Sequence, residues 1–373
     1  MAKQSKSKVI RNSLLRFLSW FYAFGVWVRN KCFDWGILKQ RSHPVPVVVV
    51  GNLAVGGTGK TPHVEYLIQL LSRDYNIGVL SRGYRRQTSG FILASSRSTP
   101  EMIGDEPYQI YSKYGNQVKV AVCADRNEGI TKLREVHPEI NLILLDDAFQ
   151  HRYVKADLSI VLMEYNRLPY NDHILPYGRL RESIHGLERA SIVVVTKCPD
   201  DFKSMDFRII KKNLDLFPSQ GLFFSQYKYR SLQPVFPESI RCHYTLGMLN
   251  DKDTILSITG IANPRPFTRY LRTHRAMVKS IRYADHHAFE RRDMEFILNK
   301  YDSLPGNIKL ILTTEKDSVR FASNPYFPEE LKPFIFYVPI SIDFIPYLNM
   351  DFNERILKEL QSISIKKSKA EQQ

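Results

Sequence analysis

A lysine and a threonine directly follow a glycine-rich turn in the segment GNLAVGGTGKTP (51–62), which a run of valines precedes. When such a turn joins a strand to a helix, backbone N–H groups face an incoming phosphate, and glycines let the chain approach it closely. The lysine then reaches the β- and γ-phosphates, and the hydroxyl holds Mg²⁺. Lys60 and Thr61 occupy those two places, so the segment predicts a nucleotide phosphate site.

The turn departs from the usual phosphate-loop pattern at one position. The pattern G-x-x-x-x-G-K-[ST] requires glycine at position 54, where this chain has alanine, and a double glycine supplies the flexibility instead. A merely structural glycine turn is the alternative, but the expected strand before it and helix after it favour the phosphate site. The expected loop comprises Ala54, Val55, Gly56, Gly57, Thr58, Gly59, Lys60 and Thr61.

A phosphate loop needs a second metal anchor, normally an acid at the end of a neighbouring apolar strand. The segment LILLDD supplies Asp146 and Asp147. Paired acids could instead cap a following helix, but their combination with Lys60 favours a Mg²⁺-nucleotide site. The segment TKCPD (196–200) resembles the guanine-reading T-K-x-D motif of GTPases with its acid one residue too far along. ATP is therefore favoured over GTP.

Phosphoryl transfer also needs a base that orients the attacking hydroxyl and cations that match the phosphoryl oxygens. The candidates are Asp105 in GDEP, Arg126 in ADRNEG, and Arg181 with Glu182 in LPYGRLRES. Each of them alone would be a solvated loop charge in most proteins. Together they indicate an acceptor site.

These residues require elements that hold them at one edge of a sheet. Apolar runs alternate with helical patterns through the first half of the chain, which predicts a doubly wound, mostly parallel α/β sheet with helices on both faces. The expected strands are 45–51, 76–84, 118–122, 141–147, 157–163 and 191–197, and the expected helices are 60–74 and 126–136.

A second α/β block without a glycine-rich loop begins near residue 218, so the phosphate site lies in the first half. We expect an N-terminal membrane-interface helix (1–40), a P-loop kinase domain (41–215), a smaller C-terminal α/β domain that closes the active-site cleft (216–365) and a frayed tail (366–373).

The formal net charge of +15 favours an anionic partner, which could be nucleic acid, a membrane surface or a phosphorylated substrate. The basic flanks of the N-terminal segment narrow this choice. Between Arg16 and Arg29 lies an uncharged, aromatic-rich stretch that is shorter than the ~20 residues of a spanning helix. A helix lying in the membrane interface fits best, and an amphipathic helix packed on the protein's own core is the alternative. The four cysteines form no C-x-x-C pair, which suits a reducing cytoplasm.

The chain resembles the tetraacyldisaccharide 4'-kinases of lipid A biosynthesis. The resemblance runs from about residue 14 to about residue 345, and its combination of motifs is specific. The matching segments are GNLAVGGTGKTP (51–62), LSRGY (80–84), GDEP (104–107), ADR (124–126), LLDDAFQH (144–151), LPYGRLRE (175–182), TGIANP (259–264), ADHHAF (284–289) and TTEKD (313–317). The family has glycine where this chain has Ala148.

The resemblance implies ATP-dependent phosphorylation of the 4'-hydroxyl of a tetraacyldisaccharide 1-phosphate, which forms lipid IVA at the cytoplasmic face of the inner membrane of a Gram-negative bacterium. It implies a peripheral or singly anchored enzyme. Carried over by motif, Lys60 contacts the phosphates, Thr61 and Asp146 hold Mg²⁺, Asp147 supports that shell, Asp105 is the general base, His286 is its partner, and Arg126, Arg181 and Glu182 are further active-site residues.

Three other functions remain open from the residues alone. A P-loop GTPase or assembly factor would hydrolyse nucleotide without a hydroxyl acceptor. A nucleic-acid-binding ATPase would gather its basic residues in a groove with stacking aromatics, whereas the densest cluster here flanks the N-terminal helix. A membrane adaptor would leave the GKT and DD motifs unexplained. We expect no nucleic-acid partner, and no segment indicates an obligate protein partner.

Overall fold

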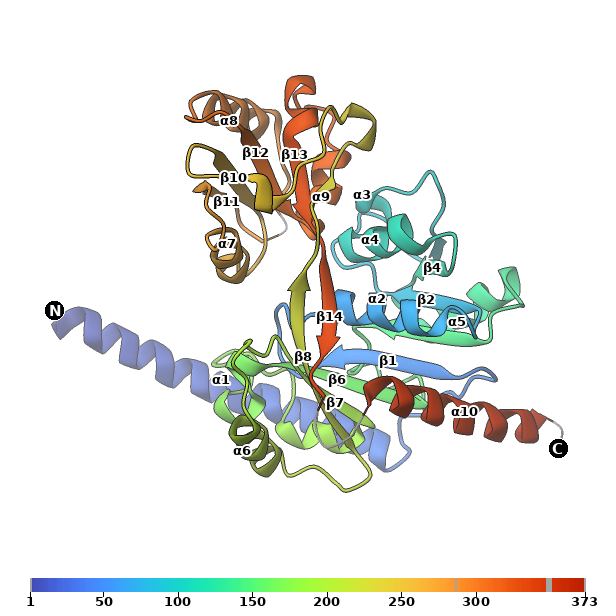
Figure 1. The fold of residues 1–373 in the computed structure, drawn as a ribbon. Coiled ribbons are helices and arrows are strands. Elements are labelled where there is room, and N and C mark those ends of the chain that lie inside the picture. The colour runs from blue at the N-terminus through green and yellow to red at the C-terminus, as the bar shows by residue number, and fades with distance from the viewer. Residues whose placement is uncertain (1, 286, 347–350, 372–373) are drawn as a thin grey trace.

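The chain builds two sheets, one above the other in Figure 1. The computed structural model describes residues 2–285, 287–346 and 351–371. Within them, a nine-stranded sheet has the order β14-β8-β7-β6-β1-β5-β2-β4-β3 and a five-stranded sheet has the order β11-β10-β12-β13-β9. We call the parts built on them the large unit and the small unit.

The central strands of the large unit are all parallel, and its two edge strands are antiparallel to their neighbours. The strands are β1 (Val47–Asn52), β2 (Ile77–Ser81), β3 (Ile92–Leu93), β4 (Lys119–Val122), β5 (Leu142–Asp146), β6 (Leu158–Glu164), β7 (Ile192–Thr196), β8 (Gly221–Tyr229) and β14 (Ile340–Phe344). The mostly parallel α/β sheet that the sequence predicts is confirmed.

Helices cover both faces of this sheet, because its parallel strands are apolar on both sides. Buried residues of α2 (Lys60–Leu71), α4 (Asp105–Tyr114) and α10 (Phe352–Glu371) pack against one face. Buried residues of α5 (Arg126–Val136) and α6 (Ser204–Leu214) pack against the other. The short helix α3 (Pro100–Ile103) precedes α4. The glycine-rich segment between β1 and α2 is therefore held at both ends, since both elements are anchored in the core.

The small unit repeats this layered arrangement. Its strands are β9 (Gln233–Pro234), β10 (Thr254–Thr259), β11 (Met277–Arg282), β12 (Lys309–Thr314) and β13 (Ile335–Val338), and all but β9 are parallel. Helix α7 (Arg265–Leu271) packs on one face. Helices α8 (Arg291–Asp302) and α9 (Glu315–Ala322) pack on the other.

The strand order differs from the expected division of the chain in two places. Strand β8, expected to open the second block, pairs with β7 in the large sheet, and β14 returns to pair with β8. Helix α10 covers the large sheet and continues through most of the expected frayed tail, where Lys367 binds Asp157 at 2.9 Å. Apolar periodicity identifies a strand but not its pairing partner, so these long-range pairings were not readable from the sequence.

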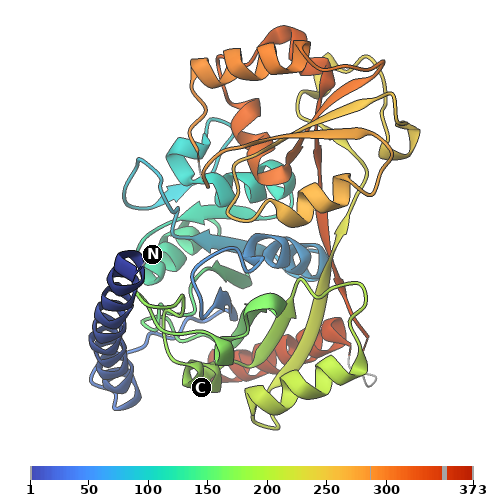
Figure 2. The same ribbon diagram turned by 90° about the vertical axis from the view of Figure 1, so that its left-hand side faces the viewer.

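Helix α1 (Ala2–Asp34) lies against the large unit and points its N-terminal end away from the molecule, as Figures 1 and 2 show. Ser19 donates a hydrogen bond to the carbonyl oxygen of Ile174 at 2.9 Å, and Phe33 is buried. Trp20, Phe24 and Trp27 instead face solvent, with 66%, 55% and 52% of their surfaces exposed. Among the described residues, no helix is both long enough and apolar enough to cross a membrane.

Candidate active site

The glycine-rich loop lies between the end of β1 and the start of α2, and contacts on several sides fix its shape. Gly59 has a φ of 92°, and a Cβ atom there would lie 2.4 Å from the hydroxyl of Tyr227, so this position requires glycine. Asn52 donates a side-chain hydrogen bond to the hydroxyl of Thr58 at 2.9 Å. The hydroxyl of Thr196 donates to the carbonyl oxygen of Thr58 at 2.8 Å. The loop is thus held in a defined shape by the protein itself.

The residue that follows strand β7, Lys197, makes a second contact with the glycine-rich loop. The ammonium group of Lys197 donates to the carbonyl oxygen of Gly57 and lies 3.4 Å from a carboxylate oxygen of Glu164. Lys197 has a φ of 57°, which is unusual for a residue with a side chain. The TKCPD segment therefore supports the glycine-rich loop through its first two residues.

The paired acids lie at the end of β5, the strand next to β1. Asp146 pairs in register with Val50, so it stands beside the strand that leads into the loop. Its side chain is buried, and Oδ1 has no hydrogen-bond partner in the structure. Burial and the neighbouring charge of Asp147 raise the pKa of Asp146 to about 7. Buried polar atoms normally have a hydrogen-bond partner, so this oxygen is a candidate ligand for a bound cation.

Asp147 has the opposite environment. Its carboxylate lies 3.5 Å from the ammonium group of Lys60 and accepts hydrogen bonds from Arg181 at 2.9 and 3.3 Å. Burial alone would raise the pKa of Asp147, but Lys60 and Arg181 outweigh it and hold this pKa below its usual value. Lys60, Asp147 and Arg181, predicted from three separate motifs, therefore meet directly. Thr61 follows Lys60 in the first turn of α2 and is half-buried.

A hydrogen-bonded chain connects this cluster to α1. The side chain of Gln150 accepts from Arg181 at 3.2 Å and donates to Glu182 at 3.0 Å. Glu182 is buried and pairs with Arg189 at 2.7 Å, and it accepts from Asn30 of α1 at 3.2 Å. Arg181 and Glu182 thus both belong to this hydrogen-bonded cluster, and their direct partners are protein groups.

Arg126 is buried at the start of α5 and donates to the carbonyl oxygens of Cys123 and Ala124 at 3.1 and 2.9 Å. Burial lowers the pKa of this guanidinium, and the nearby charge of Asp146 opposes that effect. His151 is kept neutral, because burial lowers its pKa to about 4. The Arg126 guanidinium is thus close enough to Asp146 and Asp147 to interact with their charges, while its hydrogen bonds go to backbone carbonyl oxygens.

Asp105 begins α4, and its carboxylate oxygen Oδ2 accepts two hydrogen bonds from Arg320 of α9, at 3.1 and 2.7 Å. The next residue, Glu106, is close enough to Asp146 for its charge to contribute to the raised pKa of that acid. Lys316 joins Glu106 to Asp285 at 3.4 and 3.5 Å, which brings the ADHHAF segment of the small unit to the start of α4. His286 itself lies outside the described residues.

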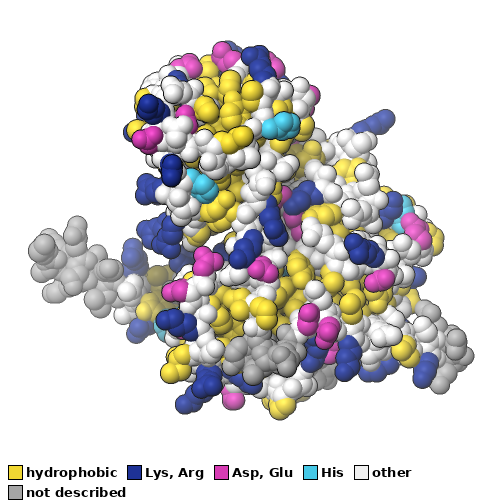
Figure 3. All heavy atoms as spheres, in the orientation of Figure 1, with side chains coloured by type: hydrophobic (Ala, Val, Ile, Leu, Met, Phe, Trp, Pro, Cys, Tyr) yellow, Lys and Arg dark blue, Asp and Glu magenta, His cyan; other side chains and the backbone are white. Residues whose placement is uncertain are grey.

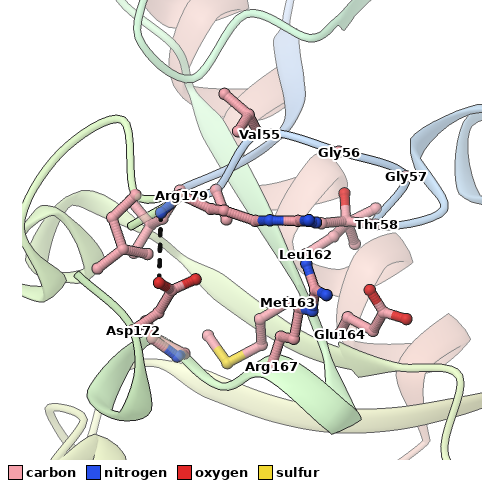
Figure 4. Close-up of a pocket in the computed structure, with 14 residues that line it drawn as sticks. Val55, Gly56, Gly57, Thr58, Leu162, Met163, Glu164, Arg167, Asp172 and Arg179 are labelled. Atoms are coloured by element: carbon pink, nitrogen blue, oxygen red, sulfur yellow. Dashed lines mark hydrogen bonds between the residues drawn. The ribbon is translucent and has the colours of Figure 1, made fainter. Parts of the chain in front are cut away.

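A small recess of about 40 Å³ lies along the glycine-rich loop on the side of β6 (Figure 4). Arg167 and Arg179 contribute cationic side chains to it, and Asp172 accepts a hydrogen bond from the backbone N–H of Arg179 at 3.2 Å. Figure 3 shows more basic side chains gathered where the small unit meets the large unit. Both features suit anionic ligands.

Comparison with known proteins gives a family for this arrangement. The family model described as tetraacyldisaccharide-1-P 4'-kinase matches residues 11–361. The chain belongs to this family. It is 49% identical over 347 residues to the tetraacyldisaccharide 4'-kinase of Bacteroides thetaiotaomicron, with 91% of each chain covered. It is 42% identical over 334 residues to that of Flavobacterium johnsoniae, with 90% of this chain and 93% of the relative covered.

A solved structure agrees with this membership. A crystal structure of LpxK from Aquifex aeolicus in complex with ATP superposes with a TM-score of 0.72 at 26% identity, covering 94% of this chain and 99% of that chain. The chain is therefore a tetraacyldisaccharide 4'-kinase family member, and the kinase reading of the sequence is confirmed over the GTPase, nucleic-acid and adaptor readings.

Sequence reasoning did not find several residues that shape this site. Asn52 and Gln150 lie inside quoted motifs without an assigned role, Arg320 lies outside them, and all three act through hydrogen bonds to motif residues. One signal was available, because Arg320 follows Asp317 of TTEKD by three residues on one helix face, and these two side chains pair at 3.0 Å.

Proposed function

We propose that this chain transfers the γ-phosphoryl group of ATP to the 4'-hydroxyl of a tetraacyldisaccharide 1-phosphate with the residues described above. The glycine-rich loop acts as the phosphate cradle, and Lys60 neutralises the β- and γ-phosphates. Asp147 and Arg181 hold the Lys60 side chain and its surroundings before ATP arrives. The observation that carries this proposal is the buried, unpartnered carboxylate of Asp146 beside the loop.

The donor groups at this position fit Mg²⁺. This ion prefers oxygen ligands and is usually held by one or two carboxylates together with phosphates and water. Asp146 and the hydroxyl of Thr61 would hold it, and Asp147 would support this shell. Among the described residues there is no group of three or more His, Cys, Asp or Glu side chains that could form a full protein cage. When bound, the ion neutralises charge on the phosphate oxygens.

Asp105 is the proposed general base. As the bond from the 4'-oxygen to the γ-phosphorus forms and the bond to the β-phosphate oxygen breaks, the hydroxyl proton passes to the carboxylate, and ADP leaves. Position supports the role, since Asp105 begins a helix whose next residue lies within electrostatic range of Asp146. Arg126 and Arg181 supply positive charge around the phosphates, and Glu182 orients Arg181 through Gln150. His286 is proposed as the partner of Asp105.

An Asp105→Asn variant is expected to lower kcat about a hundredfold, because the amide cannot accept the proton. The assay incubates purified protein, Mg²⁺ and γ-labelled ATP with tetraacyldisaccharide 1-phosphate in detergent micelles and then measures label in the lipid. Asp74→Asn, an exposed acid in a turn, is the matched control. Unchanged lipid labelling by Asp105→Asn would remove Asp105 from the role of base.

We further propose that the enzyme acts at the cytoplasmic face of the inner membrane, with α1 lying in the membrane interface. ATP is cytoplasmic, and a substrate with four acyl chains stays in the bilayer. The exposed aromatic side chains of α1 suit the depth of lipid headgroups, and its basic flank suits anionic lipid. The packed side of the same helix reaches the site through Asn30 and Glu182.

Replacing Trp20, Phe24 and Trp27 together by serine is expected to weaken binding to anionic phospholipid vesicles at least tenfold, since each large apolar side chain contributes about 1.5–3 kcal/mol when it leaves water. Vesicle sedimentation measures the bound fraction. Serine at Met205, Ile209 and Phe217, which are also exposed but lie in and after α6, is the control. Equal losses in both triple variants would contradict an interface role for α1.

The two units are proposed to divide the work. The large unit, with β8 and β14 included, holds the nucleotide, and the small unit contributes the acceptor side through the ADHHAF segment. The ion pairs at the start of α4 support this division, because Lys316 links Asp285 of the small unit to Glu106, the residue after the proposed base.

A further inference from the structure

Two motifs of the small unit, TGIANP (259–264) and TTEKD (313–317), supply none of the proposed catalytic or metal-binding residues. Both converge on Asp317, whose side chain is fully buried. Its Oδ2 atom accepts a hydrogen bond from the backbone N–H of Gly260 at 2.9 Å and another from the hydroxyl of Thr314 at 2.7 Å. These two bonds hold one oxygen of the Asp317 carboxylate in place.

The other oxygen of Asp317 holds Arg320. Oδ1 accepts from Nη1 of Arg320 at 3.0 Å, and the same nitrogen lies 3.5 Å from the carbonyl oxygen of Gly260. The remaining donors of the guanidinium, Nε and Nη2, both reach Oδ2 of Asp105. Because the guanidinium is planar and rigid, a fixed Asp317 dictates where these two donors point.

The contact joins the two units at a sheltered position. Arg320 is on α9 of the small unit, and Asp105 is at the start of α4 of the large unit. Only 10% of the Arg320 side chain and 17% of the Asp105 side chain are exposed, so the pair is screened far less than a surface ion pair. Both hydrogen bonds go to one carboxylate oxygen, Oδ2, and fix the position of that atom.

We propose that Arg320, held by Asp317, is a positioning residue that orients the Asp105 carboxylate toward the acceptor hydroxyl. This inference rests on the proposed role of Asp105 as base. In phosphoryl transfer, positioning contributes more than basicity, so a cation beside the base costs little reactivity while orienting it. The TGIANP and TTEKD motifs then act by holding Asp317, which in turn holds Arg320.

The test compares kcat and KM in the lipid-labelling assay for Arg320→Met and Arg320→Lys, each alone and combined with Asp105→Asn. Arg320→Met is expected to lower kcat ten- to a hundredfold with the KM for ATP unchanged, as for a misplaced catalytic group. Arg320→Lys should recover part of the loss, since it restores the charge without the fork of donors. In the Asp105→Asn background, Arg320→Met should cost nothing further.

Lys113→Gln is the matched control, because Lys113 also joins the two units, through ion pairs with Glu65 of α2 and with Glu315 of α9. We expect it to change kcat less than threefold in folded protein, because Lys113 lies at the opposite end of α4 from Asp105. Arg320→Met losses that are equal in both Asp105 backgrounds, or matched by Lys113→Gln, would reduce Arg320 to a docking contact.

Folding and the proposed function are checked separately. Thermal unfolding identifies any variant that does not fold, and Arg320→Gln then replaces Arg320→Met, since its amide can still donate to Asp317. If Asp105→Asn itself keeps the normal rate, the assignment of the base fails. If Asp105→Asn is impaired while every Arg320 variant is normal, the base stands and the positioning role is overturned.

Discussion

A Lys60→Met variant is expected to transfer phosphate to the lipid about a thousandfold more slowly than the natural protein. The methionine side chain keeps the apolar stem but removes the charge that matches the phosphates as negative charge redistributes in the transition state. It also leaves Asp147 with Arg181 as its remaining cationic partner among those that contact it in the structure. Both kcat and kcat/KM should fall, and lipid labelling over a long incubation measures the residual rate.

Lys132→Met is the control for this loss. Lys132 pairs with Glu128 at 2.7 Å on the exposed face of α5 and has no contact with the loop. Its substitution removes the same charge from the same protein. A Lys60→Met rate within tenfold of the natural rate would mean that the glycine-rich loop is not the phosphate cradle.

An Asp146→Asn variant is expected to lose about a thousandfold in lipid phosphorylation and yet to gain stability in the absence of ATP and Mg²⁺. Activity falls because the amide is a poor replacement for a carboxylate ligand of Mg²⁺. Stability rises because the buried carboxylate is costly, its pKa being raised from 3.8 to about 7. A site that is built for a ligand rather than for the empty fold should respond in both ways.

The pH dependence of that gain has a definite sign. Since the folded-state pKa of Asp146 lies above its unfolded value, the folded protein binds the proton more tightly, and stability is lost as the pH rises from about 4 to about 7. At about 1.4 kcal/mol per pH unit the full cost is on the order of 4 kcal/mol, and the unpaired amide retains part of it. We expect Asp146→Asn to be about 2 kcal/mol more stable at pH 8 and less so at pH 5.5.

Denaturant unfolding of both proteins at the two pH values, without ligand, measures this difference. Asp74→Asn supplies the comparison for loss of an exposed acid. A stability gain that is the same at both pH values would show that Asp146 is not the titrating group. A fully active Asp146→Asn enzyme would remove Asp146 from the metal site.

The segments of the proposed phosphate site were predictable because their signals are local. A buried strand, a glycine turn and Lys60 follow one another within one segment, and Asp146 ends a second apolar strand. The carboxyl ends of parallel strands meet at one edge of a sheet, so these two segments had to meet once the sheet was parallel. The mostly parallel α/β fold followed from the same apolar runs.

The missing parts depend on pairings between distant segments. The hydrogen bonds from Arg320 to Asp105 span 215 residues, and no spacing rule connects two such positions. Strand β14 was not expected at all, because its residues alternate only weakly between buried and exposed and its partner is more than 100 residues earlier. The Arg320–Asp105 pair and the pairing of β14 with β8 both follow from the fold and not from any local sequence preference.

The course of β8 and β14 makes the small unit an insertion in the large one. The chain leaves the nine-stranded sheet after Tyr229 and returns at Ile340, and these two residues are register partners. The neighbouring pair on the side of the small unit is joined as well, because the backbone N–H of Arg230 donates to the carbonyl oxygen of Pro339 at 2.9 Å. Excising residues 231–338 and closing the gap with a short hairpin turn would therefore leave every strand of the large sheet in place. By its connections, the small unit is a module inserted between two paired strands of the large sheet.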